Sequence, residues 1–228
     1  MANILQIETA TQTCSVALAI AGETVALKEE TAKNIHAGSL TLFIDAVMQQ
    51  AGLRYQDLDA VAVSKGPGSY TGLRIGVSTA KGLCFALDKP LIAIDTLKMM
   101  ANGFLVENPA YEGLICPMID ARRMEVFTAL FDENLNAVTP VIAKIIDTNS
   151  YAAELAAHHV TFIGDGASKC SDILQHPNAV FSAINYNSAD YLTPLALTAY
   201  NQHTFEDVAY FEPYYLKDFV FTTPKKKV

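Results

Sequence analysis

Residues 64–76 read SKGPGSYTGLRIG, a run that combines a strand end, a tight turn and a helix start. Gly66 and Gly68 permit backbone angles that other residues avoid, and Pro67 stiffens the turn between them. Ser69 is placed to act as the N-cap of the helix that follows. Such a unit either presents free backbone N–H groups to an anion or is a tight turn required by packing. It is not a Walker A loop, because the GxxxxGK pattern is absent.

Hydrophobic periodicity on both sides of this run predicts an α/β chain in which strand, strand, strand, helix, strand, helix occurs twice. A gap-free shift of 112 residues places Ile7-Glu8 on Ile119-Asp120 and Ala17-Leu18 on Ala129-Leu130. Each half then has a carboxylate at the end of its first strand, so we expect two related lobes. The predicted strands are 3–9, 13–20, 24–30, 59–64, 90–94, 114–120, 124–131, 136–146 and 160–164. The predicted helices are 36–51, with a stop at Gly52, 70–86, 96–105, 150–157 and 188–202.

Composition argues against a protein that grips nucleic acid by itself, because 24 acidic residues outnumber 16 basic ones and the net charge is −8. The four cysteines are scattered singly, without the pairs that a zinc site or a disulfide framework uses. The N-terminus opens into a strand-like run instead of a signal peptide, and no apolar stretch reaches about 18 residues. We expect a soluble, cytoplasmic protein.

The run GPGSYTGLRIG, followed by Ala80-Lys81-Gly82-Leu83, closely resembles the signature of the TsaB (YeaZ-like) family. More distantly it resembles the paralogous TsaD family of glycoprotease M22-like proteins. The residues that make up the motif loop are Gly66, Pro67, Gly68, Ser69, Thr71, Gly72 and Arg74. Further similar segments follow in order along the chain: 4–9 with 14–18, His36 with Leu40, Phe43 and Ile44, 120–123 with 125–127, and 213–217.

The resemblance implies an α/β fold of the actin, sugar-kinase and Hsp70-like (ASKHA) class, with an N-terminal lobe at 1–105 and a reduced C-terminal lobe at 106–228. It implies a non-catalytic partner of a TsaD-like transferase, acting with a TsaE-like ATPase. The reaction is the threonylcarbamoylation of adenosine 37 in tRNAs that read ANN codons. The resemblance further implies that tRNA is met only through the complex, that no cofactor is bound and that no membrane is involved.

A TsaD-like metal site requires two histidines one helical turn apart, which places both rings on one face. Here His36 is followed four residues later by Leu40, and His158, His159, His176 and His203 offer no substitute, so we expect no metal site. Glu8, Asp120, Gly164 and Gly166 are weak nucleotide-binding candidates. Against them, the turn 9–13 lacks glycine and the turn 121–124 carries two arginines. An ASKHA-type ATPase or phosphotransferase is therefore the alternative reading, and an M22-type metallopeptidase is a weaker one.

Two predicted helices, 36–51 and 70–86, are apolar on more than one side. Gly72, Gly76 and Ala80 form a smooth side of the second helix, where another backbone can come close. Either both helices are central in a large core, or they offer a surface to TsaD or, without it, to a second copy in a two-fold dimer. The residues predicted for this partner surface are Leu42, Ala46, Leu73, Gly76, Val77 and Ala80. We interpret the terminal Lys225, Lys226 and Lys227 as a solvated tail.

Overall fold

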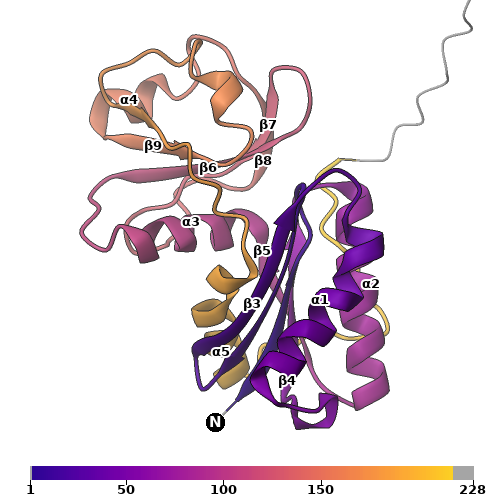
Figure 1. The fold of residues 1–228 in the computed structure, drawn as a ribbon. Helices are drawn as coiled ribbons and strands as arrows, with labels where there is room; N and C mark the ends of the chain where they lie inside the picture. The colour runs from indigo at the N-terminus through magenta and orange to yellow at the C-terminus, as the bar shows by residue number, and fades with distance from the viewer. Residues whose placement is uncertain (1, 218–228) are drawn as a thin grey trace, which may run out of the picture.

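The computed structural model, which describes residues 2–217, consists of two α/β lobes (Figure 1). Each lobe is built on one five-stranded sheet that contains parallel and antiparallel pairs. The lysines Lys225, Lys226 and Lys227 of the predicted tail lie outside the described residues. Within residues 2–217, no helix is long and apolar enough to cross a membrane.

The first lobe has the strand order β3-β2-β1-β4-β5. β1 pairs antiparallel with β2 and parallel with β4, so two hairpin-linked strands are followed by helical crossovers. The helices α1 (His36–Ala51) and α2 (Tyr70–Leu87) share one apolar cluster with β1, β2 and β4, which places both helices on the same face of the sheet. The strands are β1 (Asn3–Glu8), β2 (Thr13–Ile20), β3 (Glu23–Thr31), β4 (Ala60–Gly66) and β5 (Leu91–Asp95).

The second lobe repeats this order as β8-β7-β6-β9-β10, with β6 in the place of β1. Here too the first strand pairs antiparallel with the second and parallel with the fourth. The expected fold of two related α/β lobes is therefore confirmed. The strands are β6 (Leu114–Asp120), β7 (Glu125–Thr128), β8 (Ile142–Ile145), β9 (Val160–Ile163) and β10 (Ala179–Phe181), and the short α4 (Ala152–Ala157) precedes β9.

The shift of 112 residues holds for the first strands and fails by one residue on the second strands. Ile7 pairs with Val16 in the first lobe, whereas Ile119 pairs with Phe127 in the second. The second hairpin is thus one residue shorter, and the predicted match of Ala17-Leu18 with Ala129-Leu130 lies just past the end of β7. Glu8 and Asp120 do both end the first strand of their lobe.

The predicted N-cap of α2 and the predicted end of α1 are both confirmed. Ser69 caps α2, because its hydroxyl accepts a hydrogen bond of 3.3 Å from the Gly72 amide. Gly52 ends α1 with a φ of +66°, the left-handed conformation that glycine adopts readily.

The two lobes share a base. α3 (Thr96–Glu107) contacts β4 and β5 of the first sheet and β6 of the second, and its buried side chains belong to a cluster with residues from both lobes. The single helix expected over 188–202 is instead a 3₁₀ turn, Ala189–Leu192, followed by α5 (Thr193–Asn201), which contacts β1 and β5. The sequence did not predict β10. The lobe boundary near residue 105 stays a proposal. Residues 193–206 contact the first sheet, although they follow the second lobe in the sequence.

Candidate functional site

On the first lobe, the turn between β1 and β2 is held under the start of α2. A Cβ atom on Gly68 would collide with Ala10, and one on Gly72 or Gly76 would collide with Thr9. Thr9 Oγ1 donates a hydrogen bond of 2.9 Å to the Gly72 carbonyl. The smooth side of α2 is therefore confirmed, and the backbone that comes close is that of the first hairpin in the same chain.

Glu8 ends β1 beneath this turn and is fully buried. Its Oε1 accepts a hydrogen bond of 2.5 Å from the Ala10 amide. Burial raises the pKa of Glu8 to about 7, and the Ser64 hydroxyl and the Ala10 amide offset only part of that rise. Glu8 Oε2 and Ser64 Oγ have no hydrogen bond of normal geometry within residues 2–217. A fully buried carboxyl whose pKa is raised by desolvation is poorly suited to hold a hydrated Mg²⁺.

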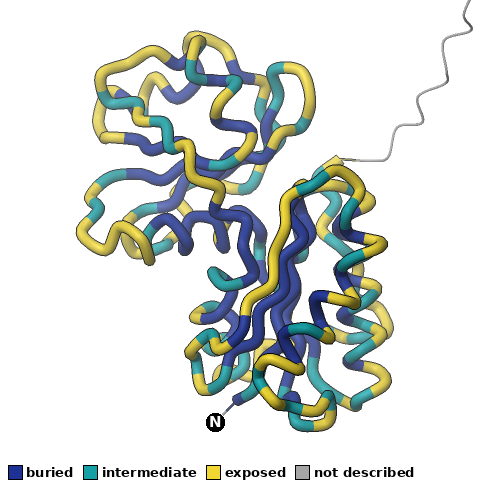
Figure 2. The backbone as a smooth tube through the Cα atoms, viewed as in Figure 1, coloured by how far each residue is buried: buried dark blue, intermediate teal, exposed yellow. Residues whose placement is uncertain are grey.

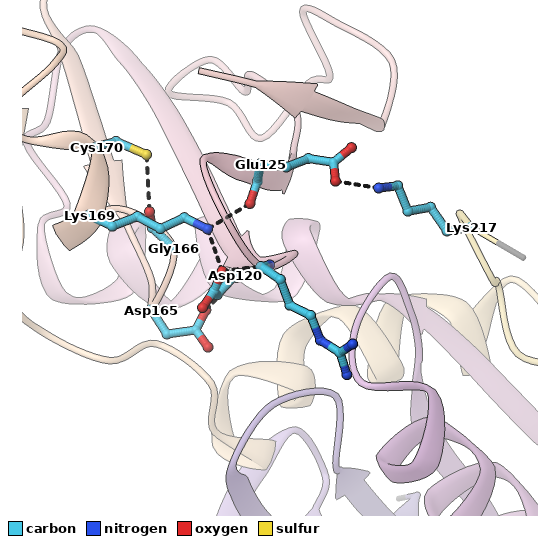
Figure 3. Close-up of polar contacts among 8 residues, drawn as sticks. Asp120, Glu125, Asp165, Gly166, Lys169, Cys170 and Lys217 are labelled. Carbon is cyan, nitrogen blue, oxygen red and sulfur yellow. Dashed lines mark hydrogen bonds and ion pairs between the residues drawn. The ribbon is translucent and has the colours of Figure 1, made fainter. Parts of the chain in front are cut away.

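On the second lobe, Asp120 is exposed at the end of β6 and lies in a network of polar contacts (Figure 3). Its carboxylate forms an ion pair with Lys169 and accepts a hydrogen bond of 2.8 Å from the Arg122 amide. The Asp120 amide donates to Asp165 at 3.0 Å, and burial raises the pKa of the Asp165 carboxyl. Asp120, the acid that corresponds to Glu8, is thus already neutralised by a lysine of its own lobe.

The second glycine turn is used for packing as well. A Cβ on Gly164 would meet Met100 and the Met118 carbonyl, and one on Gly166 would meet the backbone of Ile119 and Asp120. The Gly166 amide donates to the Met118 carbonyl at 3.0 Å. Both predicted glycines therefore lie against β6.

A pocket of about 620 Å³ lies between the two lobes. The motif loop forms one wall and the Asp120–Arg122 turn forms the other, and positive and negative groups both line it. The lining residues are Ala10, Thr11, Gln12, Ala32, Lys33, Asn34, His36, Ala37, Gly68, Ser69, Tyr70, Thr71, Gly72, Ile75, Ile119, Asp120, Ala121, Arg122, Phe127 and Asp165. Of the predicted motif residues, Gly66 and Pro67 are buried behind the pocket, while Ser69, Thr71 and Arg74 are exposed.

One group of contacts was missed by the sequence reasoning. The Tyr215 ring packs at a tilt of 34° against Tyr70, with a centroid distance of 4.6 Å, and its hydroxyl accepts a hydrogen bond of 3.3 Å from Arg74 Nε. Lys217 forms an ion pair with Glu125 at the start of β7 (Figure 3). In the sequence, the segment 213–217 is marked only by its family resemblance, because contacts between residues so far apart in the chain leave no periodic signal.

The His36 ring contacts the backbone of the first hairpin. It is buried at the start of α1, and its Nε2 lies 3.2 Å from the Thr13 carbonyl oxygen. Burial lowers the pKa of His36. Within residues 2–217, no group of three or more His, Cys, Asp or Glu side chains is arranged to hold a metal ion.

The predicted partner surface is divided by burial. Leu73, Gly76, Val77 and Ala80 are buried inside the first lobe. Leu42 of α1 is 64% exposed and Ala46 is half-buried. On α2 the exposed side carries Phe85, which is 85% exposed, and Gly82, above which there is open space. We call the outward side of the two helices the outer helical face, with Leu42, Ala46, Ser78, Gly82 and Phe85 as its residues. Figure 2 shows exposed stretches along both helices.

Comparison with known proteins gives consistent results. The family model "TsaD: tRNA N6-adenosine threonylcarbamoyltransferase" matches residues 25–224. The tRNA threonylcarbamoyladenosine biosynthesis protein TsaB of Escherichia coli is 30% identical over 223 residues, which cover 95% of each chain. The protein of the same name in Haemophilus influenzae is 29% identical over 95% of this chain and 94% of its own. The solved structure of YeaZ from Pseudomonas aeruginosa is 26% identical, has a TM-score of 0.83, and covers 95% of this chain and 100% of its own.

These matches run nearly from end to end and include both lobes, whose glycine motif and hairpin turns have just been described. The chain belongs to the TsaB (YeaZ-like) family, within the wider TsaD group.

Proposed function

We propose that this protein acts in tRNA threonylcarbamoyladenosine biosynthesis as a non-catalytic partner of a TsaD-like transferase. In this proposal it docks on the transferase through the outer helical face and supports modification of adenosine 37 in tRNAs that read ANN codons. A TsaE-like ATPase completes the machinery, which we place in the cytoplasm. The net charge of −8 supports contact with tRNA through the complex rather than by this chain alone.

The observation that carries the docking proposal is the exposure of large apolar side chains on the outer helical face. Phe85 is 85% exposed and Leu42 is 64% exposed, so each of the two neighbouring helices turns a large apolar side chain outward. Tyr210 and Ile145 are comparably exposed but lie outside these helices. Gly82 on the same face has open space above it, so a partner backbone can approach closely. Exposed apolar surface next to small residues is typical of a protein interface. In the absence of the transferase, we propose that a second copy covers the same face in a two-fold dimer.

The condition of the two strand-end acids supports a role without catalysis. Glu8 is buried beneath the hairpin turn, and Asp120 is engaged by Lys169. The glycines that would bring phosphates to the backbone are occupied by packing in both lobes. No nucleophile with an adjacent base was recognised in the sequence, and all four cysteines are buried.

One observation favours the alternative, an ASKHA-type ATPase or phosphotransferase. The pocket of about 620 Å³ has the size of a small-ligand site and is flanked by the N-terminal turn of α2. Titrating the isolated protein with a fluorescent ATP analogue separates the two functions. Saturable binding that is lost on Asp120→Ala, together with turnover of ATP, would favour the enzyme.

The proposed function is tested by a drop-out reconstitution with the TsaD and TsaE of the same organism, L-threonine, bicarbonate, ATP, tRNA and the adenylate-forming enzyme. Modified adenosine is scored with and without this chain, and with this chain in place of TsaD. We expect modification only when both proteins are present. Full modification without this chain, or modification by this chain without TsaD, would refute the non-catalytic partner.

A further inference from the structure

After α5 the chain returns along the first lobe through residues 204–217, which we call the C-terminal strap. The strap lies outside the named helices and strands and contains a turn at 208–210. The Glu206 amide donates to the Leu91 carbonyl at 2.9 Å, on the edge strand β5. Lys81 of α2 then donates to the Phe211 carbonyl at 2.8 Å and to the Ala209 carbonyl at 3.2 Å. The strap therefore follows α2 from its C-terminal half towards its first turn.

The end of the strap lies beside the pocket. The Tyr214 amide donates to the Lys65 carbonyl at 2.8 Å, and a Cβ on Gly66 would collide with the Tyr214 carbonyl oxygen. The Tyr215 ring packs at a tilt against Tyr70, which lines the pocket, and the Arg74 guanidinium lies 4.4 Å from the Tyr70 ring centre. The strap is thus fixed firmly to the first lobe up to Tyr215.

Two residues later the strap contacts the other lobe. Lys217 pairs with Glu125, whose backbone carbonyl also accepts a hydrogen bond of 2.7 Å from Lys169 (Figure 3). Lys169 in turn pairs with Asp120 in the opposite wall of the pocket. The ion pair between Lys217 and Glu125 therefore joins the first lobe to the wall-forming hairpin of the second.

The two lobes are joined in two places: by a buried apolar cluster around α3, which we call the base, and by a polar contact beside the pocket, which we call the mouth. At the base, α3 and the chain around Tyr186 form one buried apolar cluster with both sheets, which can serve as a hinge region. At the mouth lies the pocket of about 620 Å³, and the strap contact is polar and partly exposed. Two lobes that share a packed base and enclose a pocket are arranged for hinge closure.

We propose that the C-terminal strap is a clasp that holds the second lobe closed over the pocket, with Tyr215 as its anchor on α2 and Lys217–Glu125 as its releasable contact. The Lys217 and Glu125 side chains are 47% and 20% exposed. An ion pair this exposed shifts an equilibrium by no more than about fivefold, so thermal motion opens the clasp readily. The clasp is a property of the isolated chain and does not rest on the proposed function.

The test measures the distance between the lobes in the full-length protein. Cys14, Cys84, Cys116 and Cys170 are all buried, so two added surface cysteines can be labelled selectively. We choose Gln49→Cys on α1 and Gln175→Cys in the second lobe, because both positions are exposed and lie away from the strap. Spin labels at these two sites report the distribution of inter-lobe distances by pulsed dipolar spectroscopy.

Lys217→Glu places like charges at the clasp. We expect the ratio of the longer-distance to the shorter-distance population to rise by up to about fivefold. Adding Glu125→Lys to this variant restores opposite charges and should return the distribution towards that of the wild type. The matched control is Lys226→Glu, which makes the same charge change near the chain end. At about 1 M salt the screening length falls to roughly 3 Å, so the wild type should move towards the Lys217→Glu distribution.

The clasp is refuted if Lys217→Glu leaves the distance distribution unchanged. It is equally refuted if Lys226→Glu opens the lobes to the same extent, or if the charge-swapped pair does not reverse the effect. Loss of the docking function in reconstitution would leave these results unaffected, since the isolated chain is measured.

Discussion

At the scale of residues, Glu8 is a carboxyl whose burial is not compensated by an ion pair. One oxygen accepts from the Ala10 amide, and the other has no hydrogen bond of normal geometry in the described chain. Desolvation therefore dominates and raises the pKa to about 7. The sequence predicted the acid at this strand end, but not its burial, which depends on α2 lying over the hairpin.

The raised pKa of Glu8 makes the free energy of unfolding depend on pH. The pKa of Glu8 is about 7 in the folded state, above its usual value of 4.5. The proton that the folded state retains stabilises it fully below pH 4.5, and this stabilisation is lost as pH rises through 7. Its full size is roughly 3 kcal/mol.

Glu8→Gln should remove that dependence, because the amide does not titrate. Urea unfolding at several pH values between 5 and 8 should show wild type losing stability relative to the variant as pH rises. The exposed Glu112→Gln serves as the control. Parallel stability curves for wild type and Glu8→Gln would contradict the assigned burial.

The glycines of α2 give a second test at this scale. Gly72→Ala should destabilise the fold by about 1–3 kcal/mol, because the new methyl group would collide with the Thr9 carbonyl oxygen. Gly82→Ala in the same helix meets nothing within 4 Å and should stabilise it by about 0.5–1 kcal/mol. Chemical denaturation measures both. Equal effects at the two positions would show that packing against the hairpin is not what Gly72 provides.

At the scale of elements, the sequence predicted most strands and helices but could not sort the sides of α2. That helix has three apolar or small sides, and periodicity alone does not tell which one meets its own sheet. The structure buries Leu73, Gly76, Val77 and Ala80 against the first hairpin and sheet, and leaves Phe85 outside. The split of the last helix and the short β10 were missed because both are brief and are set by tertiary contacts.

The proposed docking through the outer helical face predicts the effect of two substitutions. Leu42→Asp and Phe85→Asp should each weaken binding to TsaD by about tenfold or more, because a charge would be buried in an apolar interface. Both side chains are exposed in the free chain, so the melting temperature should change little. Calorimetric titration gives the affinity.

Val106→Asp is the matched control, since Val106 is 59% exposed on α3 and lies outside the outer helical face. Unchanged affinity for both face variants, or an equal loss for Val106→Asp, would mean that the transferase docks elsewhere.

At the scale of the whole molecule, duplication was visible in the sequence because the two lobes share their element order. Three features could not be predicted from the sequence: the pocket, the ion pair of Asp120 with Lys169, and the strap. Each is formed by residues that are distant in the chain, and no regular spacing in the sequence indicates such contacts. The whole chain thus repeats one lobe twice, while its strand-end acids and glycines are taken up by internal contacts.

The central claim is that this chain supports the transferase through the outer helical face and not through the pocket between the lobes. The most direct measurement titrates the chain into the reconstituted reaction and follows modified adenosine for wild type, for the double variant Leu42→Asp with Phe85→Asp, and for Asp120→Asn. We predict that the double variant requires at least about tenfold more protein for half-maximal modification, and that Asp120→Asn matches wild type. If Asp120→Asn abolished modification while the double variant behaved as wild type, the pocket would be the functional site and the claim would be wrong.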